Sequence, residues 1–146
     1  YASVIQNHTS SIVPNLERQS HCMGSYSHNK NGGITSAQIV IPVDHLFSRG
    51  LLVSCIVEET TQLMGLPNDS DWIHPSIAND ASKIEFLTGL DYILLKILYS
   101  KQIQAGMKGK ALDNEIKRRI SELEKAGEIK RASQTVNEYG LYPFVH

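Results

Sequence analysis

The segment from Phe47 to Met64 constrains the fold of this chain more than any other. Two adjacent carboxylates, Glu58 and Glu59, follow a stretch that is apolar on nearly every side: Leu51, Leu52, Val53, Cys55, Ile56 and Val57. A helix that is hydrophobic all round is expected to be buried. Gly65 then supplies the left-handed residue that commonly ends a helix. The sequence therefore predicts a helix over residues 47–64 whose first half is buried and whose second half carries acidic groups.

Length and charge limit the classes of protein to which the chain can belong. With 146 residues, of which 41% are hydrophobic and 20% charged, it matches one ordinary globular domain. Its 14 basic and 15 acidic side chains nearly cancel, so no basic surface for nucleic acid or an anionic membrane is expected. No apolar run approaches the roughly 18 residues of a transmembrane helix. We expect a single domain without a nucleic-acid partner or membrane span.

A β-hairpin is predicted ahead of this helix. The cluster Asn29-Lys30-Asn31-Gly32-Gly33 is typical of a turn, and the β-branched stretch Ile34–Val43 follows it as a second strand that Pro42 ends. Residues 19–27 supply the first strand. Residues 1–18 are rich in Ser, Asn and Gln without clear periodicity, so an extended arm is expected there.

Two further helices are predicted after an irregular loop over residues 66–80. Thr88 caps the first, with Asp91 in a capping-box position, and this helix runs to about residue 100. The second covers about Ala111–Ala126 and ends at Gly127, and the tail from Ile129 is expected to be irregular or a short strand. The predicted class is therefore α+β: mostly helical, with a small antiparallel hairpin packed on the helix over 47–64. The expected divisions are an arm (1–18), a core (19–108) and a C-terminal helix with its tail (109–146).

The two cysteines, Cys22 and Cys55, leave two interpretations open. An even, low count fits one disulfide in an oxidising compartment. It fits equally a pair of unpaired, partly buried thiols. Spacing alone does not decide between them.

The run Glu58-Glu59-x-x-Gln62-x-x-Gly65-x-x-Asn68-Asp69 is the best candidate for chemistry, because ionised carboxylates are rarely buried without partners or a metal. Its spacing resembles the His-Glu-x-x-His-x-x-Gly-x-x-His motif of the metzincin zinc peptidases. On that pattern Glu59 stands at the general-base position and Gly65 at the turn glycine. The ligand positions all differ, being occupied by Glu58, Gln62 and Asn68, with Asp69 as the alternative to Asn68.

This resemblance implies a degenerate metzincin core over residues 19–108 that has lost its zinc site. Met107, after Gly106, is weakly similar to the methionine turn of those peptidases. The oxygen atoms of Glu58, Gln62 and Asp69 suit calcium or magnesium better than zinc. No cofactor is predicted, and a bound divalent metal is the alternative left open.

A second resemblance covers about residues 20–108. It is to a bacterial family of exported domains of unknown function, and it rests on ordered blocks: Cys55, Glu58–Asp69, Ser76–Asp80, Asp91–Tyr99 and Gly106-Met107. The family looks periplasmic, lipoprotein-like or secreted, so the resemblance implies an extracytoplasmic location. That location favours a Cys22–Cys55 disulfide. The resemblance supplies no activity.

An acidic loop is the other candidate site, with its oxygen-bearing side chains at Asn68, Asp69, Asp71, Asn79 and Asp80. It lacks the calcium-loop spacing of an EF-hand, so ordinary turn chemistry and capping are the favoured interpretation. Trp72 is expected to pack within this loop. His74 is expected to be exposed and without a role.

Two functions of different classes follow. The first is a binding or scaffold module for a peptide or protein, in which an extended segment adds to the edge strand Ile34–Val43. The second is a hydrolase that uses Glu59 as a general base, with an unusual metal site or none. A raised pKa of Glu58 or Glu59 in an open cleft would favour the hydrolase. A closed, fully hydrogen-bonded pair would favour the binding module.

Overall fold

The structure, a computed structural model, describes residues 22–79 and 81–145. In chain order its elements are β1 (Met23–His28), β2 (Ile34–Val40), α3 (Val43–Arg49), α4 (Leu52–Leu63), α5 (Gly89–Leu98), α6 (Gly109–Lys125), α7 (Glu128–Tyr139) and α8 (Tyr142–Val145). The predicted α+β class is confirmed. The expected arm over residues 1–18 lies outside the described residues.

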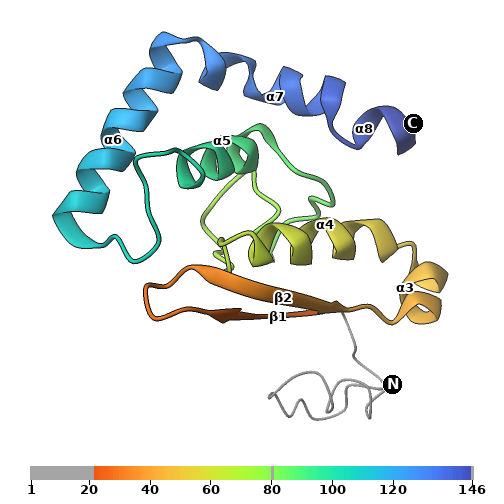
Figure 1. The fold of residues 1–146 in the computed structure, drawn as a ribbon. Coiled ribbons are helices and arrows are strands. Elements are labelled where there is room, and N and C mark those ends of the chain that lie inside the picture. The colour runs from red at the N-terminus through yellow and green to blue at the C-terminus, as the bar shows by residue number, and fades with distance from the viewer. Residues whose placement is uncertain (1–21, 80, 146) are drawn as a thin grey trace.

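The elements are stacked from the hairpin to the C-terminal helices (Figure 1). The β1–β2 hairpin lies along one side, α4 crosses over it, and α5 lies on the far side of α4. α6 and α7 form an angled pair that covers α5. Among the described residues, no helix is long and apolar enough to cross a membrane.

The hairpin forms as predicted, with slightly different bounds. β1 and β2 are antiparallel, with Met23 opposite Val40 and Gly24 opposite Ile39. In the turn, the Oδ1 atom of Asn29 accepts hydrogen bonds from the backbone N–H groups of Asn31 and Gly33, both at 2.9 Å. β2 ends at residue 40 rather than 43, because Pro42 takes the N-cap position of α3.

The single helix predicted over residues 47–64 is wrong, because Gly50 divides it into α3 and α4. Gly50 has a φ of 71°, a left-handed conformation that ends α3. The predicted burial on all sides is also wrong, since the side chains of Val53 and Ile56 are each 40% exposed. α4 packs against the hairpin and α3, whereas its opposite side is only partly covered.

The main core lies among α5, α6 and α7. It consists of the buried Ile93, Ile97, Leu123 and Ala132, with the partly buried Tyr92, Ile103 and Ile116 packed against them. α5 and α7 approach so closely that a Cβ atom at Gly89 would lie 2.7 Å from the backbone nitrogen of Ser133.

The tail predicted to be irregular or a strand from Ile129 is instead helical, as α7 and α8. Ala132 and Val136 are both buried on α7 and lie four residues apart, the spacing of one helix face. Gly127 does end α6, as predicted, but its left-handed conformation (φ 70°) starts a new helix directly. The expectation failed because a helix-ending glycine also suits a tight connection between two helices.

The described residues 66–79 of the predicted loop are irregular, as are residues 81–87 beyond it, and Asp91 anchors this segment. The Thr88 capping box of α5 is present, and the Asp91 carboxylate is 1% exposed. It also accepts hydrogen bonds from Ser76 Oγ at 2.5 Å and from the Ile77 backbone N–H at 3.1 Å. This polar contact ties the loop to the core helix.

The acidic loop uses turn chemistry, as favoured. The Asn79 side chain donates to the backbone carbonyls of Asp71 at 3.2 Å and Ile73 at 2.7 Å. Asp80 lies outside the described residues. The expectation that Trp72 packs within the loop is wrong, because its side chain is 87% exposed.

Candidate functional site: an acidic cleft

One side of α4 forms a wall of an open cleft of about 510 Å³, called the acidic cleft below. Its lining residues are Cys22, Leu46, Leu51, Ser54, Cys55, Glu58, Glu59, Gln62 and Asp69. Glu58 and Glu59 come from α4, Asp69 comes from the loop after it, and Cys22 stands directly before β1. Four of the five predicted motif positions therefore meet in one place: Glu58, Glu59, Gln62 and Asp69. The fifth, Asn68, is exposed and does not line the cleft.

Glu58 and Glu59 are both half-buried, whereas Asp69 is exposed, and Glu59 is the carboxylate that lies against β1. Burial raises its pKa above the ordinary value of 4.5, and the negative charge of Asp69 raises it further. A hydrogen bond from the backbone N–H of Gly24 acts in the opposite direction and holds the carboxylate against β1. Loss of solvation is the largest of these effects, so the net pKa is raised.

Gly24 is a site residue that sequence reasoning missed. A Cβ atom at this position would lie 2.5 Å from Glu59 Oε2 and 3.1 Å from Leu63 Cγ. Only glycine at this position allows β1 to approach α4 this closely. A glycine inside a predicted strand often marks a close backbone approach, and that signal was available in the sequence.

Gln62 fixes the loop carboxylate. Its Nε2 atom donates to Asp69 Oδ1 at 2.7 Å, which ties the loop after α4 back to the helix. The position that binds zinc in the metzincin motif therefore holds an amide that is engaged with an acid seven residues later. The neighbouring Thr61 is buried, with its hydroxyl donating to the Val57 carbonyl at 2.7 Å.

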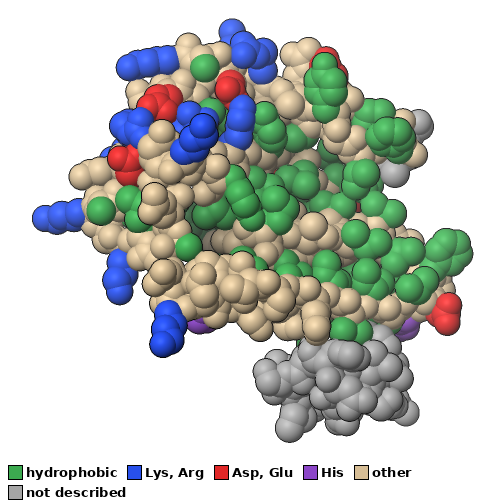
Figure 2. Space-filling model, viewed as in Figure 1, with side chains coloured by type: hydrophobic (Ala, Val, Ile, Leu, Met, Phe, Trp, Pro, Cys, Tyr) green, Lys and Arg blue, Asp and Glu red, His purple; other side chains and the backbone are tan. Residues whose placement is uncertain are grey.

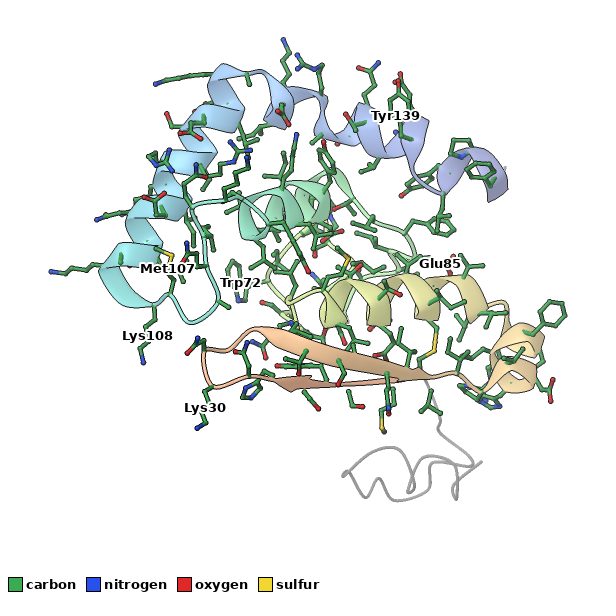
Figure 3. The ribbon with its side chains drawn as sticks, in the orientation of Figure 1. Lys30, Trp72, Glu85, Met107, Lys108 and Tyr139 are labelled. Atoms are coloured by element: carbon green, nitrogen blue, oxygen red, sulfur yellow. A yellow bond between two sulfur atoms is a disulfide. The ribbon has the colours of Figure 1, made fainter. Side chains whose placement is uncertain are left out.

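Cys22 and Cys55 form a disulfide, with their Cα atoms 5.9 Å apart. This decides between the two interpretations that spacing left open. The bond joins the start of β1 to α4 and is seen as the yellow link between them (Figure 3). Both cysteines line the acidic cleft, so the bond forms part of its wall.

The side-chain atoms of the cleft that could bind a metal are oxygens, apart from the disulfide sulfurs and the Gln62 amide nitrogen. In the described part of the chain, no histidine lines the cleft. Residues 22–79 and 81–145 contain no group of three or more His, Cys, Asp or Glu placed to hold a metal ion. His74 is exposed in the loop, as expected. Met107 is not in the cleft: it lies beside Lys108, across from Lys30 in the hairpin turn (Figure 3).

An apolar pocket of about 290 Å³ lies apart from the acidic cleft. Side chains from α4, α5, α7 and α8 line it, among them Val57, Tyr92, Val136 and Tyr142. Figure 2 shows hydrophobic side chains spread over this face, whereas Lys and Arg gather over α6 and α7. Phe86 and Tyr142 meet edge to face at one wall of the pocket, with ring centres 5.2 Å apart.

The fold and the cleft define an α+β domain in which a disulfide-anchored hairpin and a helix enclose a group of carboxylates. Residues 1–118 match the protein family described as "protein of unknown function (DUF2927)", and the chain belongs to that family. No curated protein and no solved structure matches the chain. Membership of a family of unknown function is thus confirmed, and the metzincin resemblance stays a prediction. The match ends inside α6, although α7 contributes Ala132 to the core.

Proposed function

We propose that this domain is an exported, metzincin-like binding module whose acidic cleft holds a basic side chain of an extended peptide or protein segment. The observation that carries the proposal is the gathering of Glu58, Glu59 and Asp69 around one open cleft. Carboxylates in such a setting form short, charge-assisted hydrogen bonds with Lys or Arg. A cleft of this size accepts a side chain together with part of its backbone.

The cleft, rather than the hairpin edge, is the proposed binding surface. β2, which covers most of the strand expected at Ile34–Val43, contributes no residue to the cleft. The strand that borders the cleft is β1, through Cys22 and the Gly24 contact with Glu59. Strand addition along β2 and occupation of the cleft are therefore separate binding modes, and the carboxylates favour the second.

The proposed extracytoplasmic location is supported by the disulfide. Such bonds form and persist in oxidising compartments and are rare where thiols are kept reduced. Cys22 and Cys55 are the only cysteines in the chain, and they are paired.

Fluorescence anisotropy with a labelled tetralysine peptide tests the binding proposal. The triple variant Glu58→Gln, Glu59→Gln, Asp69→Asn should bind at least about tenfold more weakly than the wild type, because the cleft loses its charge while keeping its shape. Glu124→Gln, at an exposed position on α6, is the matched control and should bind like the wild type. Equal affinity of the triple variant, or equal binding of a tetraglutamate peptide, would contradict the proposal.

A second candidate function is hydrolysis with Glu59 as the general base. The observation in its favour is the raised pKa of Glu59 in an open cleft, which is the outcome expected above for a hydrolase and a feature of catalytic carboxylates. Under this alternative, Glu59→Gln keeps the fold and abolishes turnover of a peptide library.

Metal dependence is tested separately by elemental analysis of protein purified without chelator and then dialysed against zinc, calcium or manganese. A stoichiometric metal that is lost in Glu58→Ala or Asp69→Ala would support a metal-assisted hydrolase. If no metal binds under any of these conditions, metal-dependent hydrolysis is ruled out.

A further inference from the structure

Two contacts of matched spacing hold β1 against α4. On the strand side, Cys22 and Gly24 are two residues apart, and on the helix side, Cys55 and Glu59 are four residues apart. Each spacing keeps both residues on one face of its element. The disulfide joins Cys22 to Cys55, and the Gly24 N–H bonds to the Glu59 carboxylate. The covalent bond therefore lies one helical turn from the contact that buries Glu59.

The rest of the hairpin has few attachments to the domain. The first five residues of β2 are exposed, as are the last three of β1. At the far end, the hairpin turn touches the turn after α5, where a Cβ atom at Gly106 would lie 2.6 Å from the Asn31 carbonyl oxygen. A two-stranded hairpin is at best marginally stable alone. At the cleft end, β1 is attached to α4 by the disulfide, by the contact of Gly24 with Glu59 and by the side chain of Leu63.

We propose that the Cys22–Cys55 disulfide is a redox control of the acidic cleft: while intact it holds β1 on α4, and its reduction releases that end of β1 and opens the cleft. The consequence for ligand binding rests on the function proposed above, whereas the opening itself does not. Both cysteines line the cleft, with Cys55 buried and Cys22 half-buried, so a reductant that enters by the same opening as a ligand reaches the bond at Cys22.

The chemistry of the step is thiol–disulfide exchange with a dithiol reductant. A thiolate of the reductant attacks one sulfur, giving a mixed disulfide and releasing the other cysteine as a thiolate, which takes up a proton. The second thiol of the reductant then displaces the remaining cysteine. Two electrons and two protons pass from the dithiol to the protein, which ends with two thiols, and the reductant ends as a disulfide.

Hydrogen–deuterium exchange on the full chain, before and after treatment with dithiothreitol, tests the opening. Thiol titration first establishes that two thiols have formed. Exchange should then increase much more in β1, β2 and the part of α4 around Glu59 than in α5 and α7, whose core does not include the disulfide and which lose only the general stabilisation that the bond gives the folded chain. Unchanged exchange in β1 would overturn the proposal. An equal increase in α5 and α7 would also overturn it, since the bond would then act only on the stability of the whole domain.

The double variant Cys22→Ser, Cys55→Ser is the matched control. It should show the exchange pattern of the reduced wild type in both the presence and the absence of dithiothreitol. If dithiothreitol alters exchange in this variant, the effect on the wild type does not come from the disulfide.

Binding of the labelled tetralysine peptide to the oxidised and reduced proteins then tests the consequence. The reduced form should bind about tenfold more weakly, because released carboxylates no longer converge on one ligand. If the oxidised protein does not bind the peptide, the proposed function fails while the exchange experiment still decides the redox control. If β1 opens but both forms bind the peptide equally, the link between redox state and the cleft is wrong.

Discussion

The hairpin with α4, and the helices α5, α6 and α7, are held together by different interactions. The three helices share the buried side chains Ile93, Ile97, Leu123 and Ala132. The hairpin is attached to α4 by a disulfide, a backbone hydrogen bond to a carboxylate and limited apolar contact through Leu63. The three helices are stabilised mainly by packing, whereas the half around α4 combines a few buried apolar side chains, Leu46 and Val57 among them, with a small number of specific links.

This difference explains where a cleft can exist. The α5–α7 half retains its shape through many apolar contacts of low individual strength, and the pocket on that side is lined mainly by apolar side chains, so a charged group would lose its hydration there. A half held by a few links leaves space between them, and carboxylates can stay partly hydrated there. The acidic cleft lies in the half that is held by specific links, beside the disulfide and against α4.

The largest expected effect is on the packed half and follows from removing Asp91. Asp91→Ala leaves the Ser76 hydroxyl and the backbone N–H groups of Ile77 and Thr88 without their acceptor inside the protein. We expect a loss of about 3–5 kcal/mol in the free energy of unfolding, measured by urea denaturation. Asp113→Ala, at an exposed site on α6, should change it by less than about 0.5 kcal/mol. Equal effects of the two substitutions would show that the loop anchor is unimportant.

The second effect is on the linked half. The disulfide closes a loop with a sequence separation of 33, so the Cys22→Ser, Cys55→Ser double variant should lose about 3–4 kcal/mol in the free energy of unfolding, through the greater freedom of its unfolded chain. Urea denaturation of the wild type, with and without reductant, measures the same quantity independently. A loss below about 1 kcal/mol in both experiments would mean that the hairpin does not depend on its covalent link.

A smaller effect is expected from the close approach of β1 to α4. In Gly24→Ala, the added methyl group meets Glu59 Oε2 and Leu63, and either the strand or these side chains must move. We expect a loss of about 1–3 kcal/mol by urea denaturation, with the disulfide intact. Ser27→Ala, at an exposed position of the same strand, is the matched control. If Gly24→Ala is as stable as the wild type, the contact between β1 and α4 is less tight than the structure indicates.

The smallest effect is a pH dependence that belongs to Glu59. Its pKa is raised, chiefly by burial, so the folded protein binds the proton more tightly than the unfolded chain does. This contribution to stability is complete below pH 4.5 and is lost as the pH rises through the raised pKa. The melting temperature of the wild type should therefore fall as the pH rises through the raised pKa of Glu59. The variant Glu59→Gln should lack that fall in thermal unfolding experiments. Parallel pH profiles of the two proteins would exclude a raised pKa at this site.

Local sequence signals predicted several features correctly because they act over a few residues. The capping box at Thr88 and Asp91 is complete within one helical turn. The turn at Asn29–Gly33 is closed by the Asn29 side chain and by backbone hydrogen bonds of Asn29 with Gly32 and Gly33. Glu58, Glu59 and Gln62 lie together near the end of α4 because they are close in sequence. Gly65 then turns the chain so that Asp69 returns to Gln62.

Other features could not be predicted because they depend on which surfaces meet. Gly50 interrupts an apolar pattern that would suit one continuous helix, and whether the chain turns there depends on how α3 and α4 pack. The stripe of Ala132 and Val136 on α7 is short and becomes a core face only against α5. Trp72 is apolar enough to be expected inside, but no surface in the described residues covers it.

The sequence by itself determined the α+β class, the capping and turn positions, and the order of the acidic groups along the motif, because each follows from short-range backbone and side-chain chemistry. Only the tertiary structure decided that Cys22 meets Cys55 and that Gly24 lies under Glu59. These pairs are 33 and 35 residues apart, and they meet because an antiparallel hairpin folds back across the helix that follows it. The burial of Glu59, and with it the direction of its pKa, comes from that long-range contact.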